Sequence, residues 1–275
     1  LLLGDIVRDK DVNQAIKIHQ SIILRPKISK NKKIEAHTAL AKDFLQSGDK
    51  SKAEDELNII LKMDSSNKWA LLMLKEIATK NENWKEALKH EKKLMKIDLN
   101  HKKNDESMLN YYIAMDYKSK DKIKNYLHYL EKSAAADNIY PESALELAQH
   151  NKDDVETAIS YYKLYAKNEP SQRTLAYNKI ENILFDNQQY DDVEILYKEL
   201  LEKSFDGFAL NRLVDILLEK KEVSEAHDLV DRFMKSNYSC HSIRLNKLKL
   251  ESESFEVRKS ISSLCNEMIK DEIIK

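Results

Sequence analysis

The feature that most constrains the fold is a pattern that recurs along the chain. A small side chain is followed one helical turn later by a bulky one, and the small-residue positions are Ala15, Ala53, Ala87, Tyr126, Ala158, Val193 and Ala226. Successive spacings are 38, 34, 39, 32, 35 and 33 residues. Self-similarity at such a period is typical of proteins that stack one supersecondary unit many times. We refer to these seven positions, and to sites counted from them, as the repeat frame.

The clearest copy of the unit is the stretch "ALAKDFLQSGDKSKAEDELNIILKMD", residues 39–64. It contains a Leu-small pair, an aromatic residue, a turn glycine, an alanine with a bulky residue four positions later, and a closing aspartate: Leu40-Ala41, Phe44, Gly48, Ala53, Leu57 and Asp64. This is the tetratricopeptide pattern, in which each unit is a helical hairpin. The small residue of the second helix lets the first helix approach closely, and the bulky residue fills the remaining gap. Tyr126 and Val193 are oversized for that role.

The composition agrees with a helical fold. Only three glycines and three prolines occur in 275 residues, whereas 34% of the residues are charged. A β-rich chain would need more turn residues, and abundant charge is typical of helices with solvated outer faces. We therefore predict an all-α fold, a right-handed superhelical tetratricopeptide-repeat solenoid of about seven degenerate hairpins. Residues 1–238 form this solenoid, and residues 239–275 form capping helices that lead towards a missing C-terminal domain.

A solenoid of this kind presents the first helix of each hairpin on a concave face, which is its usual binding surface. The exposed positions lie two before, two after and five after the leucine of each Leu-small pair. Ten of them form our candidate partner-binding site: Lys42, Leu72, Glu76, Tyr111, Met115, Leu147, Asn178, Asn182, Phe185 and Asn211. The same rule adds Asp215. Apolar and amide side chains suit an extended or helical protein segment. The alternative is that some of the apolar residues only pack between hairpins.

Net charge and hydropathy exclude other classes of partner. The formal net charge is −1, so no global field attracts nucleic acid or anionic lipid. No apolar run reaches the roughly 18 residues of a membrane span. The chain begins at "LLLGD" without an initiator methionine. We therefore expect an excised, soluble piece of a longer protein.

Catalytic and metal-binding motifs are absent from the sequence, so we predict no catalytic residue and no metal or cofactor site. The eight histidines have no metal-ligand spacing, and Cys240 and Cys265 form no CxxC pair. Cys265 is expected to be a packing residue. His90 and Glu91, in the charged stretch "KHEKK", are expected on the surface. His19 lies four residues after Ala15, so we predict a partly buried neutral imidazole that hydrogen-bonds to a neighbouring helix.

Three stretches carry a family resemblance: "LLLGDIVRDKDVNQAIKIHQSIILRPKIS", "AKDFLQSGDKSKAEDELNIIL" and "LEKSAAADN". The first resembles the opening cytoplasmic repeat of the lipopolysaccharide assembly protein B (LapB) family, with its Leu-Gly start and its Ala-Ile-x-Ile-His-Gln run. The other two match in order, and the repeat frame matches from Leu1 to about Lys235. The run beginning at Ala15 is fairly specific, whereas the repeat frame alone is common to many proteins.

The resemblance implies a non-enzymatic adaptor in the regulation of lipopolysaccharide synthesis and proteolysis. Proteins similar to LapB present the lipid A deacetylase LpxC to the membrane protease FtsH, at the cytoplasmic face of the bacterial inner membrane. They have an N-terminal membrane anchor and a C-terminal rubredoxin-like metal domain, and both are missing from this sequence. Homodimerisation stays open. The alternatives are a generic tetratricopeptide scaffold in another envelope or secretion assembly, and a domain whose catalytic part has been removed.

Overall fold

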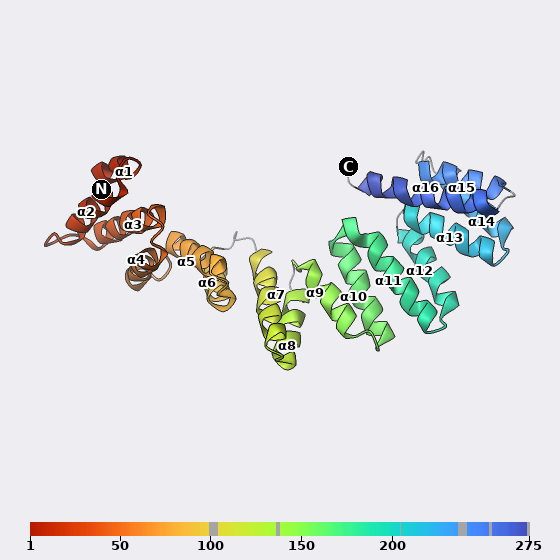
Figure 1. Ribbon diagram of the computed structural model, residues 1–275, viewed down its shortest axis with the longest axis horizontal. Helices are drawn as coiled ribbons and strands as arrows, with labels where there is room; N and C mark the ends of the chain where they lie inside the picture. Colours follow the sequence, from red (N-terminus) through yellow and green to blue (C-terminus); the bar gives the residue numbers. More distant parts are fainter. Residues whose placement is uncertain (99–103, 136–137, 204, 236–240, 253–254, 274–275) are drawn as a thin grey trace. The chain divides into compact units, whose positions relative to one another are not determined.

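The computed structural model describes residues 1–98, 104–135, 138–203, 205–235, 241–252 and 255–273 (Figure 1). These residues form sixteen α-helices, one 3-10 helix and no strand, so the all-α prediction is confirmed. The helices are α1 (Leu2–Arg8), α2 (Val12–Ile23), α3 (Lys30–Gln46), α4 (Lys50–Met63), α5 (Lys68–Lys80), α6 (Trp84–Ile97), α7 (Asn104–Ser119), α8 (Ile123–Ala134), α9 (Pro141–His150), α10 (Val155–Asn168), η1 (Pro170–Gln172), α11 (Arg173–Asp186), α12 (Tyr190–Lys203), α13 (Gly207–Glu219), α14 (Val223–Lys235), α15 (His241–Glu251) and α16 (Phe255–Ile273).

The chain divides into two compact units, Leu1–Ser143 and Ala144–Lys275. In the N-terminal unit each helix from α1 to α8 packs on the next one, and in the C-terminal unit the same holds from α10 to α16. Helices α1 to α14 correspond in order to the seven predicted hairpins. Helices α15 and α16 pair as a further hairpin and pack on α13. The predicted boundary between residues 238 and 239 lies outside the described residues.

The repeat frame marks the most buried positions of the second helices. Its seven small-residue positions are all at most 3% exposed: Ala15, Ala53, Ala87, Tyr126, Ala158, Val193 and Ala226. The bulky site four residues later is buried in all seven hairpins as well, by His19, Leu57, Glu91, Leu130, Tyr162, Tyr197 and Val230. One sequence period therefore predicts, for the second helix of each hairpin, which side faces the neighbouring helices.

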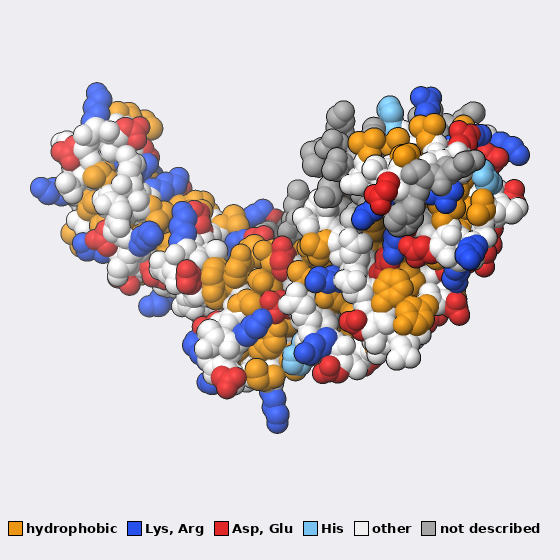
Figure 2. Space-filling model, turned by 45° about the vertical axis from the view of Figure 1, so that its right-hand side comes forward, with side chains coloured by type: hydrophobic (Ala, Val, Ile, Leu, Met, Phe, Trp, Pro, Cys, Tyr) orange, Lys and Arg blue, Asp and Glu red, His pale blue; other side chains and the backbone are white. Residues whose placement is uncertain are grey.

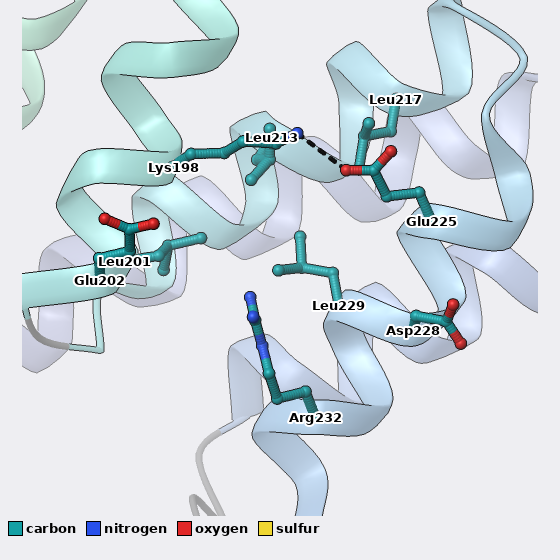
Figure 3. Close-up of a pocket in the computed structure, with 9 residues that line it drawn as sticks. All are labelled: Lys198, Leu201, Glu202, Leu213, Leu217, Glu225, Asp228, Leu229 and Arg232. Carbon is teal, nitrogen blue, oxygen red and sulfur yellow. Dashed lines mark hydrogen bonds and ion pairs between the residues drawn. The ribbon is translucent and has the colours of Figure 1, made fainter.

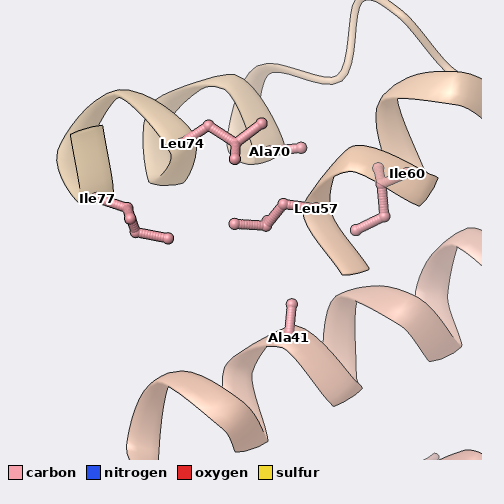
Figure 4. Packing of buried hydrophobic residues seen from close by; sticks show 6 residues of the cluster. All are labelled: Ala41, Leu57, Ile60, Ala70, Leu74 and Ile77. Atoms are coloured by element: carbon pink, nitrogen blue, oxygen red, sulfur yellow. The ribbon is translucent and has the colours of Figure 1, made fainter. Parts of the chain in front are cut away.

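Hydrophobic packing between consecutive hairpins is clearest where α3, α4 and α5 meet (Figure 4). Leu57 and Ile60 of α4 lie between the alanine side chain of Ala41 and the apolar face of α5, which contributes Leu74. Leu57 is fully buried. Burying a side chain of this size contributes about 1.5–3 kcal/mol. The cluster includes residues of two hairpins, so neither hairpin could bury its apolar face alone.

Five hairpin turns share one backbone geometry although only one of them has glycine. The residue with a left-handed φ is Gly48, Glu82, Asp121, Gln188 or Lys221. The next backbone N–H donates to a carbonyl five residues back, as from Asn83 to Ala78 (2.8 Å) and from Glu222 to Leu217 (2.8 Å). This bond satisfies a carbonyl that the helix end leaves open. The turn is therefore retained where the sequence has lost its glycine.

Replacing Lys221 by glycine should stabilise the C-terminal unit. The φ of Lys221 is 65°, a region that costs a residue with a Cβ about 1 kcal/mol. Lys221→Gly should therefore raise the unfolding free energy by about 0.5–1 kcal/mol. Lys179→Gly in the middle of α11 is the control, because it should lower stability by about 0.7 kcal/mol. Urea unfolding followed by far-UV circular dichroism measures both, and equal effects of the two substitutions would contradict the prediction.

His19 is a packing residue, as its place in the repeat frame predicted. Its side chain is fully buried, its Nδ1 lies 2.6 Å from a carboxylate oxygen of Asp43 on α3, and its Nε2 lies 3.2 Å from the carbonyl of Leu1. The contact with Asp43 joins the ring to a neighbouring helix, as predicted, whereas the burial is complete and not partial. A Cβ at Gly4 would meet the ring at 2.3 Å, so glycine lets α1 lie against it.

The surface position predicted for His90 and Glu91 is wrong. His90 is 4% exposed and Glu91 is fully buried. Glu91 occupies the bulky site of its hairpin, four residues after Ala87, and accepts a hydrogen bond from Nζ of Lys75 on α5 at 3.0 Å. Burial lowers the pKa of His90. The charged neighbours in the sequence suggested a solvated face, but the position in the repeat decides burial.

Candidate functional site

The ten predicted partner-binding residues fall into three sets by exposure. Lys42, Glu76, Asn178 and Asn182 are exposed, and Leu72, Tyr111, Met115 and Phe185 are partly buried. Leu147 and Asn211 are each 1% exposed, so neither side chain lies on an open surface of this structure, contrary to the exposed position that the repeat frame predicted. Leu147 lies in α9 with the buried residues Ala144 and Ala148. The side-chain oxygen of Asn211 accepts a hydrogen bond from the Lys249 ammonium group.

A cavity of about 380 Å³ in the N-terminal unit contains two of the predicted residues. It lies between α5 and α7, which are the first helices of two consecutive hairpins. Its lining consists of Leu72, Met73, Lys75, Glu76, Thr79, Lys80, Asp105, Met108 and Leu109. The rule that selected first-helix positions therefore leads to a real hollow at Leu72 and Glu76. We call this hollow the α5–α7 cavity.

The floor of the α5–α7 cavity is apolar. Leu109 is buried, and Leu72, Met73 and Met108 are partly buried. Methionine side chains adapt to differently shaped apolar groups because they are unbranched and polarisable. Such a floor can accept one leucine-sized or phenylalanine-sized side chain of a partner.

Ion pairs surround this floor. Lys80 lies 2.6 Å from Glu76, and Lys75 lies 2.6 Å from Asp105 and 3.0 Å from Glu91. Burial lowers the pKa of Lys75, but the hydrogen bonds to Asp105 and Glu91 outweigh that effect and raise it, so its ammonium group stays charged. An apolar floor with a charged rim is the arrangement found at protein interfaces, where the rim sets orientation and specificity.

Tyr111 and Met115 continue along α7, but neither is in the lining of the cavity. The Tyr111 ring packs 4.9 Å from that of Tyr140 and 5.5 Å from that of Tyr112, which in turn stacks on Trp84 at 4.5 Å. Burial, followed by a hydrogen bond with Tyr112, raises the pKa of the Tyr140 hydroxyl. For Tyr111 the alternative of packing between hairpins is therefore the better interpretation.

In the C-terminal unit the predicted residues of α11 have different environments. Asn178 and Asn182 are exposed, whereas the Phe185 ring packs 5.8 Å from that of Tyr190 at the start of α12. None of these three side chains lines the hollow between α12, α13 and α14, which we call the α12–α14 hollow. Their role in binding stays a prediction.

A second hollow of about 370 Å³ lies between α12, α13 and α14 (Figure 3). Leu213 and Leu217 of α13 line its base, and an ion pair of 2.8 Å joins Lys198 of α12 to Glu225 of α14. Two of its three helices are second helices of hairpins. The sequence rule considered first helices alone, so it could not select this surface.

Charge is mixed on the surface. On the face in Figure 2, lysine and arginine side chains lie among aspartate and glutamate side chains over the described part of the chain, so this face shows no extended field of one sign.

Within the described residues, no group of three or more histidine, cysteine, aspartate or glutamate side chains could hold a metal ion. Among those same residues, no helix combines the length and apolar character that crossing a bilayer requires.

Stacked helical hairpins with this repeat frame define a tetratricopeptide-repeat protein. The chain is similar to lipopolysaccharide assembly protein B: it is 25% identical to the protein of Escherichia coli K12 over 138 residues, 50% of this chain and 36% of the relative. To the protein of Haemophilus influenzae it is 33% identical over 98 residues, 35% of this chain and 25% of the relative. The matches thus span about a third or less of these relatives. No family model matches.

Solved structures with similar helical arrangements include a tetratricopeptide repeat protein from Parabacteroides merdae and the pilF protein of Pseudomonas aeruginosa. The first is 14% identical, covers 94% of this chain and 95% of its own, and has a TM-score of 0.36. The second is 14% identical, covers 81% of this chain and 99% of its own, and has a TM-score of 0.30. The described helical hairpins and their repeat frame show the tetratricopeptide fold.

Proposed function

We propose that this chain is a non-enzymatic tetratricopeptide adaptor that acts in the manner of lipopolysaccharide assembly protein B. In this proposal it binds the deacetylase LpxC and presents it to the protease FtsH at the cytoplasmic face of the bacterial inner membrane. Two observations support it: the similarity to relatives named for lipopolysaccharide assembly, and the α5–α7 cavity. The cavity carries the binding part of the proposal.

An adaptor of this kind needs no catalytic group. Holding a client and a protease on one chain turns their encounter into an intramolecular event, with an effective concentration in the millimolar range for short links. The α5–α7 cavity would take an apolar side chain of one partner, while the Glu76–Lys80 and Lys75–Asp105 pairs orient the residues beside it. Regulation then comes from geometry and mass action.

The cavity proposal predicts that charge placed on its floor blocks binding. Leu72→Asp combined with Met108→Asp should weaken the binding of purified LpxC or FtsH about tenfold or more, because one buried leucine-sized side chain contributes about 1.5–3 kcal/mol. Pull-downs and titration calorimetry with the separate partners measure the effect. Leu248→Asp on α15, at a side chain that is 54% exposed, is the matched control and should leave binding unchanged.

The outcomes separate the proposals. Undiminished binding by a folded Leu72→Asp, Met108→Asp double variant would remove the cavity from the interface and direct attention to the α12–α14 hollow. Failure of the unmodified chain to bind either LpxC or FtsH would refute the proposed role in lipopolysaccharide regulation. The generic scaffold in another envelope or secretion assembly would then be the better proposal.

A further inference from the structure

The last helix, α16, lies against the first helix of the preceding hairpin. It packs on α13 and contacts η1, in addition to its own partner α15 (Figure 1). Because first helices present the binding face of a tetratricopeptide array, the position of α16 on α13 decides whether that face is open.

The atoms that join the two helices belong to predicted partner-binding positions. The Ser262 hydroxyl of α16 donates to the Asp215 carboxylate at 2.9 Å, and the Asn211 side-chain amide lies 3.5 Å from the Ser262 carbonyl. One helical turn further along α16, Cys265 is fully buried. Helix α16 therefore occupies the surface of α13 that the repeat frame assigns to a partner.

A buried lysine orients the polar side chains of this surface of α13. Lys249 of α15 is fully buried, and its Nζ donates to Asn211 at 2.5 Å and to Asp215 at 2.8 Å. Burial lowers the pKa of Lys249, and the Asp215 carboxylate opposes that effect. Lys249 thus fixes the orientation of Asp215 and Asn211, so the acceptor and the amide donor are in place before a helix arrives.

We infer that this face of α13, formed by Asn211 and Asp215 over Lys249, is a helix-binding surface with α16 as its resident occupant, which a partner helix must displace. The partner is an amphipathic helix with a hydroxyl donor and, three residues later, a small apolar side chain, as Ser262 and Cys265 provide. This inference concerns the C-terminal unit and is independent of the proposed role of the α5–α7 cavity.

Helix α16 is held on α13 in a way that allows another helix to replace it. Val257 and Leu264 on α16 remain 47% and 46% exposed, so only part of its apolar surface is buried. Tethering nevertheless gives α16 an effective concentration in the millimolar range, which a competitor in solution must overcome. A free helix of the same sequence should therefore bind weakly to the intact chain and strongly once α16 is released.

The test uses the full chain and a fluorescently labelled peptide of residues 255–273, with binding followed by anisotropy. Cys265→Arg should expel α16 from α13 and lower the Kd of the peptide at least about tenfold relative to the unmodified chain. Adding Asp215→Ala should remove that gain. Ser263→Arg, at an exposed position of α16, is the matched control and should leave the Kd unchanged.

Equal peptide affinity for the unmodified chain and a folded Cys265→Arg variant would overturn the inference, as would a gain that survives Asp215→Ala. If Cys265→Arg does not fold, hydrogen exchange on the unmodified chain decides the matter. Excess peptide labelled with ¹³C and ¹⁵N should then speed amide exchange in residues 255–265 of the chain and leave α13 protected. Unchanged exchange in 255–265 would refute displacement.

Discussion

Asp43→Ala is expected to destabilise the N-terminal unit by about 3 kcal/mol. Asp43 of α3 is fully buried, and its carboxylate accepts hydrogen bonds from the Arg8 guanidinium of α1 and from His19 of α2. Removing it leaves the fully buried His19 ring nitrogen without its carboxylate partner and takes one carboxylate from the partly buried Arg8 guanidinium, and losing one member of a buried pair costs about 3–5 kcal/mol. We choose the lower end because Arg8 also pairs with Asp5.

Tryptophan fluorescence measures this effect in isolation. Both tryptophans of the chain, Trp69 and Trp84, lie in the N-terminal unit, so a urea titration followed by fluorescence reports on that unit alone. The control is Asp55→Ala at an exposed position of α4, which should change stability by less than about 0.5 kcal/mol. A loss below about 1 kcal/mol for Asp43→Ala would show that the three helices are held by apolar packing instead.

The repeat frame predicted much of the fold because tetratricopeptide packing is periodic. Each hairpin meets its neighbours in the same way, so the repeat frame determines which residues are buried in the second helix of each hairpin. His19 was placed correctly on this ground. The prediction for Glu91 was wrong because its charged neighbours indicated a solvated face. Glu91 occupies the same position of the repeat frame as His19 and Leu57, and that position is buried.

The candidate site was predictable only in part. The positions of Leu72 and Glu76 follow from the local geometry of first helices, and the structure places both in one cavity. The burial of Asn211 depends on Lys249 and Ser262, which lie 38 and 51 residues away in the chain. No local pattern specifies that α16 returns to α13, since this contact breaks the repeat. Sequence periodicity therefore predicts the scaffold better than it predicts which part of the scaffold is open.

A second large loss of stability is expected for Glu181→Ala in the C-terminal unit. Glu181 is the hydrogen-bond partner of a polar residue at the bulky site of the repeat frame. Tyr197 occupies that site four residues after Val193, and its hydroxyl donates to Glu181 of α11 at 2.8 Å. Nε of Arg212 on α13 donates to the same carboxylate at 2.9 Å. Glu181 thus joins three consecutive helices, as Asp43 does in the N-terminal unit. Burial raises the pKa of the Tyr197 hydroxyl, which therefore stays protonated and can donate.

Glu181→Ala should lower the unfolding free energy of the C-terminal unit by about 3 kcal/mol, because it leaves the buried Tyr197 hydroxyl and the Arg212 guanidinium without their acceptor. Far-UV circular dichroism during urea unfolding should show this loss, while the tryptophan signal of the N-terminal unit stays unchanged. Glu199→Ala, at an exposed position of α12, is the control and should shift the curve by less than about 0.5 kcal/mol. A shift in the tryptophan signal equal to that in circular dichroism would instead mean that the two units unfold as one, which the separate cores do not predict.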